Sequence, residues 1–197
     1  QAFGDVKHLF DPRGIMNPGK IIDCPPMTEN LRFGPGYQPL QIETVLDFSK
    51  DFGFSGAVEL CNGVGACRKT LNGTMCPSYM ATREEEHSTR GRANILRGVL
   101  SGKLPASEFT SKRMHDVLDL CLGCKACKNE CPSNVDMAKL KSEFLHHYHA
   151  SQGTPLRTRL FAHIAAVNRV ATKFRVFSNF AMRSSFVRWI FEWFLGI

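Results

Sequence analysis

The chain contains the stretch Cys121-Leu-Gly-Cys124-Lys-Ala-Cys127-Lys-Asn-Glu-Cys131-Pro132, whose cysteines follow the spacing C-x₂-C-x₂-C-x₃-C-P. In this pattern three thiolates wrap one iron–sulfur cluster, and the fourth, before the proline, ligates a different cluster. Zinc sites usually pair two short Cys/His groups across a longer gap, and disulfides between such crowded residues would be strained. The stretch therefore predicts an iron–sulfur site.

A second group of cysteines precedes it, in Cys61-Asn-Gly-Val64-Gly-Ala-Cys67 and in Cys76-Pro77. Val64 stands where a middle cysteine would be, so the group has one thiol fewer. If the cysteine before each proline crosses to the other group, two ligand sets result. The first is a 4Fe–4S set of Cys76, Cys121, Cys124 and Cys127, and the second is a set of Cys61, Cys67 and Cys131.

The type of the second cluster stays open at this point. Three thiolates suit a 3Fe–4S cluster, whose vacant corner needs only a small apolar neighbour such as Val64, and we favour this interpretation. The alternative is a 4Fe–4S cluster with a ligand other than cysteine. His87 is the best substitute by its place in the sequence, although a histidine near a helix start commonly bonds to the backbone instead. Cys24 stands apart and is expected to be a bystander thiol.

The composition is that of an ordinary globular protein, with 197 residues, 43% of them hydrophobic, and eight cysteines. Because seven of these cysteines have metal-ligand spacing, we expect a reducing compartment, hence the cytoplasm, rather than a secreted disulfide scaffold. The sequence has no signal peptide and no apolar run long enough to cross a bilayer. It begins at Gln1 without an initiator methionine, so we expect a segment of a longer protein.

Hydrophobic periodicity predicts a mainly α-helical domain around the cysteines. Three helices are expected. The first begins within residues 84–94 and ends at Gly102, the second spans 107–120, and the third runs from after Pro132 to about residue 150. Ser88 or Thr89 would cap the first. On this helix, Arg90 and Arg92 either offset the negative charge of the clusters or form a solvated face. Upstream, Val45–Phe48 and Phe52–Phe54 suggest a β-hairpin.

The last part of the chain, residues 154–197, is expected to be helical, basic and aromatic. From residue 151 onward it carries seven Arg or Lys and one acidic residue, which is most of the net charge of +7. Basic residues beside Trp and Phe are typical of helices at a membrane surface. They also suit contact with another domain, and we prefer this second interpretation.

The segment Asp11-Pro-Arg-Gly-Ile-Met-Asn17-Pro-Gly-Lys20 resembles the closing motif D-P-x-x-x-x-N-P-G-K of FAD-linked oxidases of the vanillyl-alcohol-oxidase type. The resemblance implies that Asn17 and Lys20 approach FAD, with a plain turn at a domain edge as the alternative. Four parts follow: an FAD-domain edge at 1–22, a partly extended linker at 23–57, a two-cluster α-helical ferredoxin domain at 58–153, and a tail at 154–197 leading to a further domain.

A wider resemblance rests on C-N-G-V-G-A-C-R, M-C-P-S-Y, E-H-S-T-R-G-R-A-N-I-L-R and the stretch quoted first. Up to about residue 150 the chain is similar to bacterial fusions of an FAD-linked oxidase with a two-cluster ferredoxin domain. Such proteins are dehydrogenases of D-2-hydroxy acids such as 2-hydroxyglutarate, lactate or glycolate. The fold resembles the α-helical ferredoxin domain of the succinate dehydrogenase iron–sulfur subunit, in which an apolar residue also replaces a middle cysteine.

The resemblance implies partners as well as cofactors. These are an upstream FAD domain, a downstream cysteine-rich domain or acceptor protein, and the quinone pool or membrane surface at the inner membrane face. The sequence itself has no catalytic triad, carboxylate pair or phosphate loop, so we expect it to carry electron transfer and not substrate chemistry.

Two other functions compete with this one. The chain could be a ferredoxin-like subunit of a glycerol-3-phosphate dehydrogenase or heterodisulfide reductase complex, against which residues 1–22 argue. A metal-stabilised nucleic-acid-binding module would need aromatic and arginine side chains on one platform. The dense thiol run argues against this, so we expect no nucleic acid.

Overall fold

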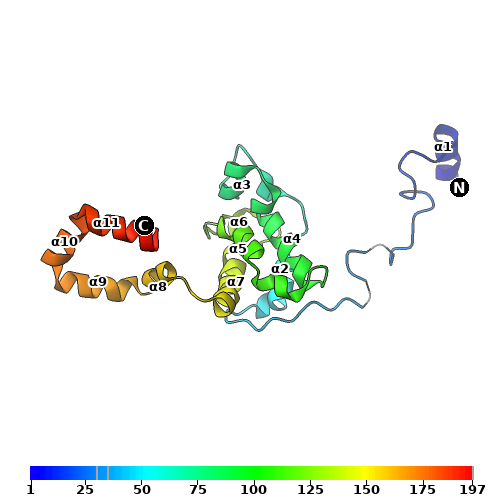
Figure 1. Cartoon of the computed structure of the whole chain (residues 1–197). Coiled ribbons are helices and arrows are strands. Elements are labelled where there is room, and N and C mark those ends of the chain that lie inside the picture. Colours follow the sequence, from blue (N-terminus) through cyan, green and yellow to red (C-terminus); the bar gives the residue numbers. More distant parts are fainter. Residues whose placement is uncertain (30, 35, 197) are drawn as a thin grey trace. The chain divides into compact units, whose positions relative to one another are not determined.

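The computed structural model describes residues 1–29, 31–34 and 36–196 and is built of helices and loops (Figure 1). Asn30 and Pro35 of the predicted linker and Ile197 of the predicted tail lie outside the described residues. No strand occurs in the described part, so the prediction of a mainly α fold is confirmed. The contacts divide the chain into two compact units, residues 1–39 and 40–197.

The first unit holds one helix, α1 (Ala2–Phe10), followed by a loop that Asp11 organises. The buried Asp11 carboxylate accepts hydrogen bonds from the backbone N–H groups of Ile15 (3.0 Å) and Met16 (2.8 Å) and from the Lys7 ammonium. The Lys7 hydrogen bond, helped by the two backbone bonds, holds the pKa of Asp11 below its ordinary value despite burial. The first residue of the D-P-x-x-x-x-N-P-G-K motif therefore fixes the loop that carries the rest of it.

Up to residue 152, the second unit consists of α-helices and short 3₁₀ turns joined by loops. In chain order these are η1 (Ser49–Asp51), α2 (Gly53–Glu59), η2 (Ala66–Arg68), α3 (Pro77–Thr82), η3 (Glu85–His87), α4 (Thr89–Leu100), η4 (Ala106–Thr110), α5 (Lys112–Asp119), α6 (Ala126–Glu130) and α7 (Met137–Gln152). The three helices expected around the cysteines are thus α4, η4 with α5, and α7.

The core of this unit gathers side chains that are distant in sequence. Ala93 and Leu96 of α4 are fully buried, and α4 packs against α2, α5 and α7. Beside it, Phe48, Phe54, Phe109 and Phe144 form a chain of edge-to-face ring contacts, with centroid distances of 5.4, 5.9 and 5.8 Å. Edge-to-face stacking is a favoured arrangement of buried aromatic rings. The core therefore begins well before the first cysteine group.

The expected hairpin at Val45–Phe54 is wrong, because its backbone donors bind elsewhere. The N–H groups of Val45 and Leu46 both donate to the carboxylate of Glu143 in α7, at 2.9 Å each. Phe52 then adopts a left-handed conformation (φ 58°) and α2 follows directly. The apolar residues of this segment serve a helical core instead, in which Phe48 and Phe54 are buried.

Residues 156–195 form α8 (Leu156–Ala162), α9 (Ile164–Lys173), α10 (Arg175–Arg183) and α11 (Ser185–Leu195), all without a buried residue. Trp189 and Trp193 stack on α11 with ring centroids 6.3 Å apart, yet each is more than half exposed. Among the described residues, none of the helices combines the length and the hydrophobicity that crossing a bilayer requires.

Candidate iron–sulfur centre

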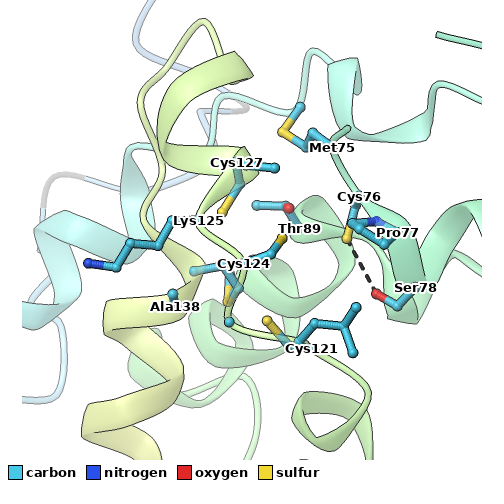
Figure 2. A pocket seen from close by; sticks show the side chains of 14 residues that line it. Met75, Cys76, Pro77, Ser78, Thr89, Cys121, Cys124, Lys125, Cys127 and Ala138 are labelled. Atoms are coloured by element: carbon cyan, nitrogen blue, oxygen red, sulfur yellow. Dashed lines mark hydrogen bonds between the residues drawn. The ribbon is translucent and has the colours of Figure 1, made fainter. Parts of the chain in front are cut away.

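Four cysteines line one pocket of the second unit, and Figure 2 shows their sulfur atoms turned toward the same space. Cys121 and Cys124 come from the loop between α5 and α6, and Cys127 from the first turn of α6. Cys76 arrives from the other group and lies immediately before α3, which Pro77 begins. All cysteines of the chain are free thiols. Four convergent thiols are a donor set that suits a cubane cluster.

The loop that carries Cys121 and Cys124 is shaped by two residues in the left-handed region. Gly123 has φ 63° and Lys125 has φ 59°, so the backbone curls around the pocket between the cysteines. Glycine adopts this conformation without penalty, whereas Lys125 does so at some cost. At the start of the loop, the half-buried Lys141 of α7 donates to the carbonyls of Cys121 (2.7 Å) and Asp119 (2.8 Å). The loop is therefore held from α7 as well as by its own turns.

A second pocket is lined by the other three cysteines of the two groups. Cys61 follows α2, Cys67 lies in η2, and Cys131 follows α6. Val64 also lines this pocket and is 63% exposed. Among the described residues, the lining includes no fourth sulfur and no imidazole. The structure thus brings together both sets of cysteines that the crossing rule predicts.

His87 and Cys24 lie outside both pockets. The Nδ1 atom of His87 is 2.9 Å from the Thr82 hydroxyl, and Nε2 is 3.6 Å from a Glu86 carboxylate oxygen. These contacts occupy the imidazole, and their partners are side chains rather than the backbone. Cys24 is exposed and belongs to the first unit.

The comparison with protein families agrees with this geometry. Residues 57–135, which hold both pockets, match the model of a 4Fe–4S dicluster domain. We refer to residues 57–135, which match this model, as the dicluster domain. The domain thus binds iron–sulfur clusters, and the prediction of iron–sulfur chemistry is confirmed.

Several proteins of assigned name are similar to this chain. The chain is 33% identical to a D-2-hydroxyglutarate dehydrogenase of Pseudomonas putida over 81% of its own length and 19% of that protein. It is 29% identical to the enzyme of the same name of Escherichia coli over 98% of its length and 22% of that protein. A probable glycolate oxidase iron–sulfur subunit of Bacillus subtilis is 38% identical over 34% of this chain and 15% of its own. The chain spans about a fifth of the length of the two dehydrogenases. No solved structure matches it.

The first turn of α4 separates the two pockets of the dicluster domain. Thr89 is buried and lines both of them. The N–H of Arg90 donates to the sulfur of Cys67 at 3.3 Å, and the Ser88 hydroxyl caps the helix by accepting from Gly91 at 2.9 Å. Of Ser88 and Thr89, the two residues expected to cap this helix, Ser88 is therefore the cap. The position of Thr89 between the pockets had no signal in the sequence.

The thiols of the dicluster domain differ in how readily they ionise. Burial raises the pKa of Cys67 and of Cys127. Burial also opposes ionisation of Cys76, but hydrogen bonds from Ser78 and the Tyr79 backbone, together with the charge of Arg92, lower its pKa overall. Arg92 is fully buried, so the alternative prediction that it belongs to a solvated helix face is wrong for this residue.

Asn17 and Lys20, the residues expected near FAD, lie in the first unit and not in the dicluster domain. Both are exposed and both line a pocket of that unit, together with side chains of α1 such as Phe3 and Val6. Between them Gly19 turns the chain with φ 64°. The structure thus places the two residues at one pocket, and their contact with FAD stays a prediction.

Proposed function

We propose that this chain is the iron–sulfur electron-transfer segment of a flavin-dependent dehydrogenase of 2-hydroxy acids. The observation that carries the proposal is the pair of thiol-lined pockets that share Thr89 within one dicluster domain. Two clusters so close form a path along which electrons leave singly. A flavin accepts two electrons from a substrate, and iron–sulfur clusters pass them on one at a time.

The donor sets assign ligands to each cluster. In this proposal one 4Fe–4S cluster binds to Cys76, Cys121, Cys124 and Cys127, and the second cluster binds to Cys61, Cys67 and Cys131. We propose a 3Fe–4S type for the second, because Val64 occupies the fourth position and offers only an apolar side chain. The Arg90 N–H that bonds Cys67 would stabilise charge on this sulfur and tune the site.

The substrate class rests on the names of the relatives. D-2-hydroxyglutarate and glycolate are both 2-hydroxy acids, and proteins named for them are similar to this chain. The substrate would be oxidised at FAD, with Asn17 and Lys20 at the edge of the flavin domain. Electrons would leave through the two clusters to a cysteine-rich domain or acceptor protein, in the cytoplasm or at the inner membrane face.

A stopped-flow experiment on the full-length protein under anaerobic conditions tests the proposal. Addition of D-2-hydroxyglutarate should bleach the flavin first and the visible absorption of the clusters afterwards, while the L enantiomer should do neither. A Cys76→Ser variant should still reduce its flavin but should lose most of its dye-reducing turnover. Clusters that stay oxidised while every tested 2-hydroxy acid fails to reduce the flavin would refute the proposal.

A further inference from the structure

One arginine of the dicluster domain is buried in an unusual way. Arg92 of α4 has an exposed fraction of 0%. Its Nε donates to the Val117 carbonyl at 3.0 Å, and its Nη1 donates to the His87 carbonyl at 2.6 Å and to the Ser78 hydroxyl at 3.0 Å. Its Nη2 is buried and has no hydrogen-bond partner. Within the described part of the chain, no carboxylate forms an ion pair with it.

A buried guanidinium without a counter-ion is costly, because burial removes hydration that nothing replaces. The thiol of Cys76 can carry negative charge, and its sulfur is 3.6 Å from Nη1. Cys76 lines the pocket with Cys121, Cys124 and Cys127. A thiolate-ligated cluster there would provide the missing negative charge.

The other arginines of α4 have different surroundings. Arg90 is partly exposed, and its Nε lies 2.7 Å from a Glu85 carboxylate oxygen, which balances its charge. Arg97 is buried, but it donates to the carbonyl of Cys61 at 2.6 Å and to the Asn94 side chain at 2.8 Å, not to a sulfur. Among the described residues, Arg92 is thus the guanidinium that combines full burial, no ion pair and contact with a cysteine sulfur.

We propose that Arg92 is a positioning residue whose buried charge raises the reduction potential of the cluster held by Cys76, Cys121, Cys124 and Cys127. The inference rests on the proposed function, since it needs that cluster. Reduction adds one negative charge to the cluster, and a nearby cation in a poorly hydrated site stabilises the reduced form more than the oxidised form. Arg92 therefore makes this cluster a better electron acceptor than the same cluster would be without the buried cation.

Potentiometric titration of the loaded full-length protein, followed by EPR of each cluster, tests this. Arg92→Met should lower the one-electron reduction equilibrium constant of this cluster at least tenfold, a fall of about 59 mV or more. The second cluster should change by less than about threefold. Arg92→Lys, which keeps the cation, should stay within about threefold of the wild type. The matched control is Arg113→Met, which removes an exposed arginine paired with Glu86 and should change neither potential.

Two results would overturn the inference: an unchanged potential in Arg92→Met, or equal falls in Arg92→Met and Arg92→Lys, which would indicate packing rather than charge. If the variants do not fold, the wild type labelled with guanidino-¹⁵N arginine decides. Pulsed ENDOR should detect ¹⁵N coupled to this reduced cluster, and absence of the coupling overturns the inference. A wild type that binds no iron overturns the proposed function too, whereas clusters that accept substrate electrons without dependence on Arg92 overturn the inference alone.

Discussion

Each of the two cysteine groups ends in a cysteine followed by a proline, and each of these two cysteines lies in the pocket of the other group. Cys76 joins the pocket of Cys121, Cys124 and Cys127, and Cys131 joins the pocket of Cys61 and Cys67. The proline explains the exchange at residue scale, because it cannot donate to the preceding turn and leads the chain away. Segments more than 40 residues apart are thereby tied together at both pockets. Loss of either cysteine should then damage the cluster site of the other cysteine group.

We therefore expect Cys76→Ser to lose the 4Fe–4S cluster and Cys131→Ser to lose the second cluster, each leaving the other in place. Serine oxygen is a poorer ligand for iron than thiolate. Iron and acid-labile sulfide analysis with EPR of each variant measures this. Cys24→Ser is the control and should keep the wild-type iron content, because Cys24 is exposed in the first unit. If Cys131→Ser instead removed the 4Fe–4S signal, the crossed arrangement would be wrong.

Val64 offers a second test at residue scale. It lines the pocket of three cysteines at the position that a fourth would take. Val64→Cys should convert the second cluster to a 4Fe–4S type, raising the iron content from about seven to about eight atoms per chain. Low-temperature EPR of the oxidised protein should lose the signal of the 3Fe–4S cluster, which Val64→Ala should keep. An oxidised wild type without any such signal would contradict the proposed cluster type.

At the scale of elements, the first turn of α4 positions both pockets and depends on a close approach to η3. A Cβ atom added at Gly91 would lie 2.0 Å from the Glu85 carbonyl oxygen and 2.8 Å from the Glu86 Cα, both backbone atoms. The turn cannot yield without moving Thr89, which lines both pockets. Gly98 lies on the same helix, but a Cβ there would meet only the side chain of Leu104 at 3.1 Å.

Gly91→Ala should therefore lower the free energy of unfolding by about 1–3 kcal/mol through steric overlap and reduce the iron content of both sites. Gly98→Ala is the matched control. It should be neutral or stabilising, because alanine favours a helix by about 1 kcal/mol over glycine and the Leu104 side chain can move. Denaturant unfolding and iron analysis of both variants measure the effects. Equal behaviour of the two variants would show that the approach to η3 is unimportant.

A second element-scale contact joins the segment before η1 to α7. Glu143 is buried, and its two carboxylate oxygens accept the N–H groups of Val45 and Leu46. Glu143→Gln replaces one acceptor oxygen by an amide donor, so one of these N–H groups loses its partner. We expect the free energy of unfolding to fall by about 1–3 kcal/mol. Denaturant titration measures it, with Asp119→Asn, an exposed carboxylate, as a control expected within about 0.5 kcal/mol of the wild type.

At the scale of the whole molecule, the sequence predicts what depends on local spacing. The cysteine intervals predicted both pocket sets, and Ser88 with Gly102 predicted the extent of α4, since ligand loops and helix caps are local features. The hairpin prediction failed because the donors of Val45 and Leu46 bind Glu143, almost 100 residues away. The surroundings of Arg92 were likewise hidden, because Val117 and Ser78 come from other elements.

The measurement that tests the central claim most directly is an anomalous difference map at the iron absorption edge from crystals of the loaded protein. The account predicts two separate iron clusters. One would have density joining it to Cys76, Cys121, Cys124 and Cys127, and the other to Cys61, Cys67 and Cys131. A single cluster bound by Cys121, Cys124, Cys127 and Cys131, or two sites without anomalous signal from iron, would contradict it.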